Sequence, residues 1–241
     1  GRNGEFFTER RTMTVPDMKK ICNPSFKIRT LHFCCADIDS PNYEVYDWMV
    51  RNNMNIEMDL FQLKIPAAAR FLEARCATLR GGWHCFTRLH NGINVAGSAT
   101  ACLADYQTLF REHPERFPLI NGQRRFLEGQ QYQPCTSNPD TIKIMAKNLV
   151  AEMRACGMDK RGGRYILVNN DNTSWCECAR CKAEAESGEA WAGGISTRYW
   201  KFINALTGEA RKELPDLPAV GYGYQNYQRT PLGVKPDPRL P

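Results

Sequence analysis

The sequence predicts an α/β fold, because short apolar segments alternate along the chain with amphipathic helical segments. The apolar run at 165–168 (YILV) is typical of a strand buried on both faces, as in parallel sheets. A chain of 241 residues with 42% hydrophobic and 24% charged residues has the composition of an ordinary folded domain. We expect about six βα units. We favour an incomplete (β/α)8 TIM barrel over an open doubly wound sheet, since no Gly-rich turn follows the first strand.

Each expected element follows from an apolar run or from helix-terminating residues. Strands are expected at 28–36, 54–60, 83–88, 126–135, 165–168 and 218–224. Helices are expected at 43–51, from Pro66 to the glycines 81–82, at 101–112, at 139–157 and at 195–214. The helix at 139–157 has the clearest signals, with Asn138 as N-cap, Pro139 at its first position and Gly157 at its end.

Two regions differ in composition. Residues 1–26 are polar and basic and contain two prolines, so we expect a lead-in or linker from a preceding domain. Residues 27–241 are expected to form the barrel, with its C-terminal strands missing from this chain because only six units can be placed.

Charge and hydropathy exclude two classes of partner. The net charge is +6, but 32 basic and 26 acidic side chains are interleaved, and no basic run with aromatic residues or phosphate-binding loop is present. We therefore expect no nucleic-acid partner. No apolar run approaches the roughly 20 residues of a membrane span.

Polar residues that follow the expected strands indicate a sugar site, because ligands bind at the carboxyl ends of parallel strands. Amides and carboxylates match vicinal hydroxyls, and aromatic rings stack on pyranose faces. The residues that follow the third, fifth and sixth strands are the main candidates: Arg88, His90, Asn91, Asn170, Asp171, Tyr222, Tyr224 and Gln225. Asp171 is the strongest candidate acid, since burial behind an apolar strand would favour its protonated form. The alternative role for Asp171 is that of a structural residue in an Asx turn, and the alternative role for His90 is that of a hydrogen-bonded structural histidine.

A second signal is the run Cys176-Glu177-Cys178-Ala179-Arg180-Cys181. Three thiols in six residues can wrap a tetrahedral zinc ion, and we expect Cys135 as the fourth ligand. Such a zinc would be structural, because four thiolates leave no position for water. A disulfide, for example from Cys135 to one of the three, is the alternative, and a redox CxxC fits less well.

Together these motifs resemble the DUF4838 family. The resemblance spans roughly residues 24–241 and is carried by HPERFPLING at 113–122, CTSNP at 135–139, VNND at 168–171 and CECARC at 176–181. It implies a glycosidase-type (β/α)8 barrel related to α-glucuronidases and to glycoside hydrolase family 163, whose members are endo-acting N-acetylglucosaminidases on complex N-glycans. It also implies a secreted or periplasmic bacterial protein. Asp171 and His90 fall on the family's acidic residue and histidine, whereas Asn91-Gly92 departs from its pattern.

The expected function is therefore hydrolysis of complex glycans that contain N-acetylhexosaminides or uronides. Asp171 and Glu177 are the expected catalytic pair, or Asp171 orients a substrate acetamido group that acts as nucleophile. No cofactor is needed for that chemistry. A carbohydrate-binding barrel without catalysis is the alternative, and a zinc-dependent module that binds nucleic acid or a protein partner is a weaker one.

Overall fold

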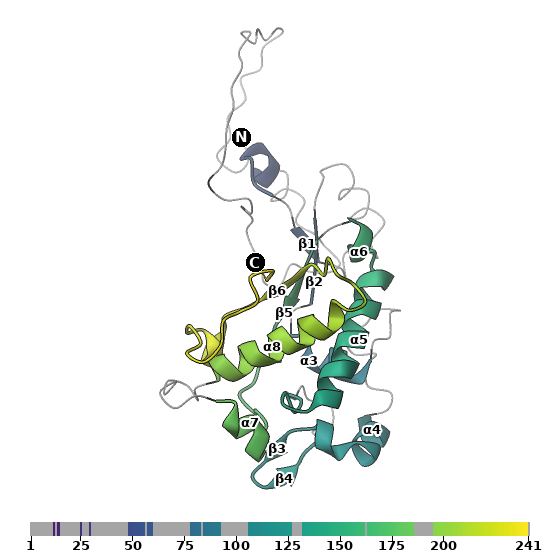
Figure 1. Ribbon diagram of the computed structural model, residues 1–241. Coiled ribbons are helices and arrows are strands. Elements are labelled where there is room, and N and C mark those ends of the chain that lie inside the picture. The colour runs from purple at the N-terminus through teal and green to yellow at the C-terminus, as the bar shows by residue number, and fades with distance from the viewer. Residues whose placement is uncertain are drawn as a thin grey trace. The chain divides into compact units, whose positions relative to one another are not determined.

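The structure of the chain is a computed structural model (Figure 1). It describes residues 12, 14, 25, 29, 48–55, 57–59, 78–82, 84–92, 106–126, 132–161, 163–185 and 195–240. The chain divides into two compact units, Gly1–Met58 with Gln62–Thr78, and Asp59–Phe61 with Leu79–Pro241. In the first unit the described residues include a short helical segment at 48–51, and Asn55 accepts a hydrogen bond from the Arg29 backbone N–H at 2.8 Å. The second unit carries the features described below.

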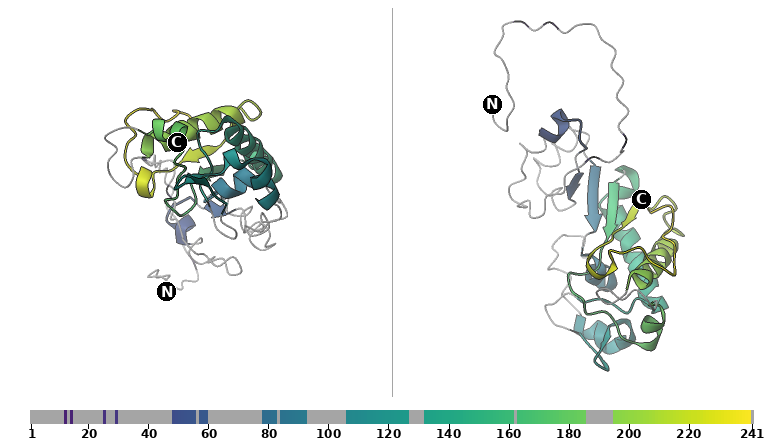
Figure 2. Two further views of the ribbon diagram at one scale, coloured as in Figure 1. Left: turned by 90° about the horizontal axis from the view of Figure 1, so that it is seen from below. Right: turned by 90° about the vertical axis from the view of Figure 1, so that its left-hand side faces the viewer.

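A parallel sheet is the framework of the second unit. Its strands are β2 (Thr78–Gly82, of which Thr78 belongs to the first unit), β5 (Gly163–Leu167) and β6 (Ala219–Gly221). The strand order is β1-β2-β5-β6, in which β1 (Glu57–Asp59) has only Asp59 in the second unit. Both β2 and β6 run parallel to β5, as Figure 2 shows. The α/β prediction is confirmed. The described strands form no closed barrel, so the finer TIM-barrel prediction is not confirmed.

Helices and one hairpin precede, connect and follow these strands along the chain. The helical elements are α3 (Phe86–Asn91), α4 (Tyr106–Glu112), η4 (Pro114–Arg116), α5 (Pro139–Ala155), α6 (Met158–Arg161), α7 (Ala179–Ala183), α8 (Ser196–Ala210) and η5 (Gln225–Tyr227). The hairpin consists of β3 (Leu119–Ile120) and β4 (Gln123–Arg124). Figure 1 shows α8 in front of β5 and β6 and beside α5, which it contacts.

The two long helices form where the sequence predicts them. Asn138 caps α5 by accepting the Asp140 backbone N–H at 2.8 Å, Pro139 occupies the first helical position, and Gly157 follows the end with a φ of 69°. The buried faces of α5 and α8 meet in the core. Their fully or nearly fully buried apolar residues are Met145, Leu149, Met153, Tyr199, Phe202, Ile203 and Leu206.

The predicted strand at 83–88 is wrong. The strand there is β2, which ends at Gly82, and α3 begins at Phe86. The predicted helix end at the glycines 81–82 is wrong as well, although residues 66–77 of that helix lie outside the described residues. Gly82 is needed for close packing, because its φ is 89° and a Cβ there would overlap the Ile166 backbone. Gly82 thus lets the parallel strands β2 and β5 approach closely.

Two other predicted strands need correction. In the segment 126–135, residues 126 and 132–135 form no strand, and the hairpin β3–β4 lies just before it. The sixth strand is β6, which is shorter than the predicted 218–224. The predicted strand at 54–60 contains β1, and the prediction at 28–36 lies almost wholly outside the described residues. The predicted linker at 1–26 also lies almost wholly outside them.

Removing the cap of α5 should lower the stability of the second unit. We expect Asn138→Ala to reduce the free energy of unfolding by about 1 kcal/mol, because the Asp140 N–H loses its acceptor. Urea denaturation followed by circular dichroism measures this change. The exposed Lys143→Ala on the same helix is the control and should change stability by less than about 0.5 kcal/mol. Equal effects of the two variants would contradict the capping role.

Candidate functional site

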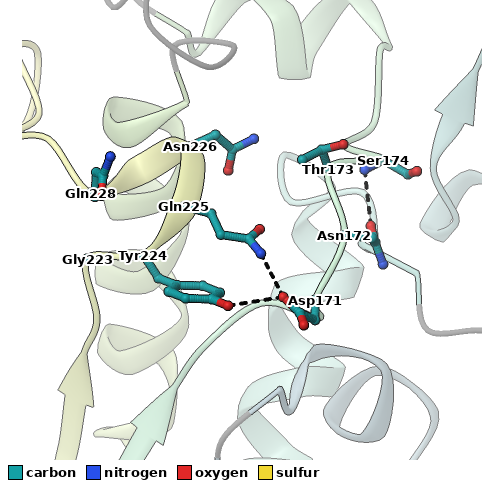
Figure 3. Close-up of a pocket in the computed structure, with 9 residues that line it drawn as sticks. All are labelled: Asp171, Asn172, Thr173, Ser174, Gly223, Tyr224, Gln225, Asn226 and Gln228. Carbon is teal, nitrogen blue, oxygen red and sulfur yellow. Dashed lines mark hydrogen bonds between the residues drawn. The ribbon is translucent and has the colours of Figure 1, made fainter.

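A pocket lies at the carboxyl ends of β5 and β6, which are neighbouring parallel strands. Its volume is about 950 Å³, within the usual range for small-molecule sites. Figure 3 shows the nine residues that line it, from the loop after β5 and from the segment after β6. They are Asp171, Asn172, Thr173, Ser174, Gly223, Tyr224, Gln225, Asn226 and Gln228. The structure therefore brings together three predicted site residues, Asp171, Tyr224 and Gln225.

Asp171 is held by two donors from the segment after β6. The Tyr224 hydroxyl donates to Asp171 Oδ1 at 3.2 Å, and Gln225 Nε2 donates to the same oxygen at 2.6 Å (Figure 3). No described residue donates to Oδ2. The expected burial of Asp171 is wrong, because the residue is exposed. The Asx turn of this loop belongs to Asn172, whose Oδ1 accepts the Ser174 N–H at 3.1 Å, so the Asp171 carboxylate is available to the pocket.

Asn170, a predicted substrate-binding residue, is instead a buried support of the same loop. Its side-chain amide donates to the Thr87 hydroxyl and to the Tyr132 carbonyl. It is fully buried and does not line the pocket. Asn169 is also buried, and its Oδ1 accepts a hydrogen bond from the Tyr227 hydroxyl. The two asparagines before Asp171 therefore fix the loop from inside.

Arg88 does not follow a strand as predicted, since it lies on α3. Its guanidinium is 3.1 Å from a Glu152 carboxylate oxygen and donates to the Tyr165 hydroxyl at 3.0 Å. Burial by itself lowers the pKa of Arg88, but Tyr165 and Glu152 outweigh burial and the net shift is upward. Arg88 on α3 thus forms a nearly buried ion pair with Glu152 on α5.

His90 and Asn91 also lie on α3 rather than at a strand end. His90 is fully buried, and its Nδ1 is hydrogen-bonded to the Tyr132 hydroxyl. That hydroxyl in turn donates to Asn91 Oδ1 at 2.8 Å. Burial, with a smaller contribution from the Arg116 charge, lowers the pKa of His90 to about 3. His90 is therefore a neutral core histidine, which was the alternative that the sequence left open.

Two predicted site residues remain, Glu177 and Tyr222, and neither lines the pocket. Glu177 is not among the residues that line the Asp171 pocket, because its Oε2 accepts the Asn121 N–H at 3.0 Å in the β3–β4 turn. Tyr222 follows β6, and its backbone N–H donates to the Tyr199 hydroxyl at 3.2 Å. Its ring centroid lies 6.1 Å from that of Tyr224, which places it next to the pocket.

His84 is a candidate that the sequence analysis missed. It follows β2, so it lies at the same strand ends as Asp171 and Tyr224. Its ring centroid is 6.2 Å from that of Tyr224, and its Nδ1 is 2.8 Å from the Asn169 carbonyl oxygen. Since a carbonyl only accepts, Nδ1 carries a proton. Correct placement of β2 in the sequence would have pointed to this histidine.

The four predicted thiols come together in space. The sulfur atoms of Cys135, Cys176, Cys178 and Cys181 all lie within 4.8 Å of one another, and this cluster could hold a metal ion. Cys135 Sγ lies 3.8 Å from Cys178 Sγ and 3.7 Å from Cys181 Sγ. All four are free thiols, and none forms the alternative disulfide. Hydrogen bonds from Cys176 and then Cys181 hold the pKa of Cys135 well below its ordinary value.

Hydrogen-bond donors surround this thiol cluster. The Leu119 N–H donates to Cys176 Sγ at 3.3 Å, and Arg124 Nη1 lies 3.5 Å from the same sulfur. The Ser137 hydroxyl is 3.0 Å from Cys181 Sγ. Such donors stabilise thiolates and orient metal ligands. The thiols therefore come from the loop before α5 and from the segment that leads into α7, while the hairpin residues Leu119 and Arg124 supply donors.

The comparison with protein families matches residues 1–240 to DUF4838, described as a domain of unknown function. The chain belongs to the DUF4838 family. No curated protein and no solved structure matches it. The predicted membership is thus confirmed, and the match does not itself assign an activity. Within the described part of this DUF4838 chain, no helix is long and apolar enough to cross a membrane.

The neutral core histidine predicts how the stability of the DUF4838 chain depends on pH. Between pH 6.5 and about 3 the unfolded chain binds a proton at His90 that the folded chain does not. The free energy of unfolding should therefore fall with decreasing pH in this window, by up to about 1.4 kcal/mol per pH unit from His90.

Urea denaturation at pH 7, 6 and 5 measures this dependence. His90→Gln should flatten it, and the more exposed His113→Gln serves as the matched control and should leave it unchanged. The same slope in His90→Gln as in the wild type would show that His90 is not the group responsible.

Proposed function

We propose that this chain is a glycoside hydrolase of the (β/α)8 type that acts on glycans containing N-acetylhexosaminides. The observation that carries the proposal is the Asp171 carboxylate. It is held by Tyr224 and Gln225 in a pocket at the carboxyl ends of two adjacent parallel strands. A secreted or periplasmic location is part of the same proposal, as the family resemblance implies.

The lining of the pocket favours a neutral sugar over a uronide. Among the nine lining residues in the described part of the chain there is no lysine or arginine, and the one acid is Asp171. A uronate carboxylate would meet a like charge without a cation to pair with it. Gln225 Oε1 and Asn226 Oδ1 are buried acceptors without a donor among the described residues. The lining therefore offers neutral amide and hydroxyl groups beside one carboxylate, which match the hydroxyl and amide groups of an N-acetylhexosamine.

The geometry supports a mechanism in which the acetamido group of the substrate is the nucleophile. In this mechanism Asp171 Oδ2 accepts the N–H of the substrate acetamido group and orients its carbonyl oxygen toward the anomeric carbon. That oxygen then bonds to the anomeric carbon while the bond to the leaving oxygen breaks, and a general acid gives the leaving oxygen its proton. Water opens the resulting ring and returns the acetamido group. The acid is not among the nine described lining residues, and Glu177 lies at the hairpin turn.

A second candidate is glycan binding without hydrolysis. The lining residues in Figure 3 include only one carboxylate, Asp171, whereas most glycosidases use two. The same amides and aromatic ring that would position a substrate would also hold a glycan that is only bound. Binding and turnover therefore need separate measurements.

Asp171→Asn tests the proposal because it keeps the size of the side chain and removes its charge. We expect it to reduce hydrolysis of a biantennary N-glycan, and affinity for N,N′-diacetylchitobiose, by at least tenfold. Calorimetry measures the affinity, and release of reducing ends over days measures hydrolysis. The control is Asp216→Asn, the same change at an exposed acid outside the pocket. Full hydrolysis by Asp171→Asn would remove Asp171 from the mechanism, and binding without turnover would favour the second candidate.

We also propose that the thiol cluster holds one structural zinc ion. With Zn–S bonds of about 2.3 Å, two sulfurs of a tetrahedral site lie about 3.8 Å apart. The distances of 3.7 and 3.8 Å from Cys135 agree with this spacing, and a disulfide would need about 2.05 Å. Arg124 offsets part of the negative charge of four thiolates and one Zn²⁺. Such a zinc would stabilise the fold without taking part in hydrolysis.

Elemental analysis tests the zinc proposal directly. We expect one zinc per chain in the purified wild type and a loss of most of it in Cys181→Ser, because one of four ligands is gone. Cys156→Ser changes a thiol outside the cluster and should keep the zinc. Titration of free thiols after zinc removal separates the alternatives, since a disulfide would leave two thiols unreactive. A wild type without zinc would contradict the proposal.

A further inference from the structure

A buried glutamine connects the thiol cluster to the pocket. Gln133 is fully buried and bonds to both residues that flank Asp171. Its Nε2 donates to the Asn170 carbonyl at 2.7 Å and to the Asn172 carbonyl at 3.0 Å, and its Oε1 accepts the Asn170 N–H at 3.2 Å. One side chain thus fixes the backbone on each side of the Asp171 carboxylate, although Gln133 itself does not line the pocket.

The same two chain segments meet again at the thiols. Cys135 lies two residues after Gln133, and Cys176 lies five residues after Asp171. A metal ion bound by both cysteines would join the segments at one end, and the Gln133 amide joins them at the other. The two links together close a small ring of backbone around the Asp171 loop. Opening either link gives the loop more conformations, which lowers the population that can bind a ligand.

Arg198 adds a third link inside that ring. Its Nε donates to the Thr136 hydroxyl at 3.0 Å, and its Nη1 donates to the Cys176 carbonyl at 2.9 Å. The side chain is almost completely buried, and its guanidinium lies 5.3 Å above the Trp175 ring centroid. A lysine at this position would have to reach both acceptors from one nitrogen, whereas the arginine uses two nitrogens held in a planar fork.

We propose that Gln133 is a positioning residue through which the metal-bound thiol cluster sets the place of Asp171 in the glycan pocket. This inference rests on the proposed function. Metal loading and glycan affinity are then coupled although none of the four thiols lines the pocket. The coupling is reciprocal, so a glycan that binds more tightly to the metal-loaded chain raises the affinity for the metal by the same factor.

The test uses Gln133→Ala with Asn204→Ala as the matched control. Asn204 is also an amide that both donates to and accepts from the backbone, at Lys235 and Asp237, but it lies on α8 outside the pocket. Three quantities are measured: zinc per chain, calorimetric affinity for N,N′-diacetylchitobiose, and hydrogen exchange of the amides at 170–174. Cobalt substitution adds a thiolate absorption spectrum that shows whether the metal site keeps its geometry.

We expect Gln133→Ala to keep one metal and its cobalt spectrum, to bind the disaccharide at least tenfold more weakly, and to exchange the amides at 170–174 at least tenfold faster. Asn204→Ala should change none of these quantities. Gln133→Ala with wild-type affinity and wild-type exchange would overturn the inference. Should Gln133→Ala not fold, Gln133→Glu replaces it, because it keeps the Oε1 acceptor and removes the Nε2 donor; the same weaker binding and faster exchange are expected, and wild-type values of both would again overturn the inference.

Failure of the proposed function can be told apart from failure of this inference. If the wild type does not bind the disaccharide, the proposed function fails. Hydrogen exchange at 170–174 still decides whether the thiol cluster fixes the Asp171 loop. Removing zinc from the wild type with a chelator should then speed exchange at 170–174 while the amides of α5 stay protected. Unchanged exchange at 170–174 after zinc removal would overturn the inference whatever the glycan result.

Discussion

The parallel pairing of β5 with β2 on one side and β6 on the other is the constraint on which the candidate site depends. Because the three strands run in the same direction, His84, Asp171 and Tyr224 all follow their strands at the same end of the sheet. Antiparallel pairing would send alternate loops to opposite ends. The close fit of Gly82 against the Ile166 backbone is part of this pairing, and the rest of the site follows from it.

Side chains, not backbone ladders, hold the loops at these strand ends. Buried amides at Gln133, Asn169 and Asn170 replace the hydrogen bonds that a strand or helix would provide. A polar atom that is buried without a partner costs roughly 1–3 kcal/mol. Among the side-chain polar atoms of these three amides, Asn170 Oδ1 is the one without a partner in the described part of the chain, and the others are all hydrogen-bonded. The thiol cluster serves the same purpose on the next stretch of the loop, where a metal ion can join segments that no ladder connects.

Features whose formation depends on residues close together in the sequence could be predicted from the sequence. The cap at Asn138, the apolar run of β5 and the close spacing of the thiols predicted α5, β5 and the cluster correctly, because each depends on nearby residues. The strand β2 was missed because its sequence, TLRGG, contains an arginine and two glycines that resemble a helix end. Its strand structure comes from pairing with β5, more than eighty residues away. Because of that error, Arg88, His90 and Asn91 were expected at the end of a strand although they lie on α3, and His84, which does follow a strand, was missed.

The polar run at 169–174 shows why residue type alone cannot separate a ligand-binding residue from a structural one. Asn169 and Asn170 are buried, Asp171 is exposed, and Asn172 forms an Asx turn, although all four suit a sugar site by chemistry. The difference between them is the direction in which each side chain points. Asn169 and Asn170 point into the core, whereas Asp171 points toward Tyr224 and Gln225 after β6. A loop with its inner face satisfied by buried amides can present a single carboxylate outward in a fixed position. A binding site needs that arrangement, and only the tertiary contacts reveal it.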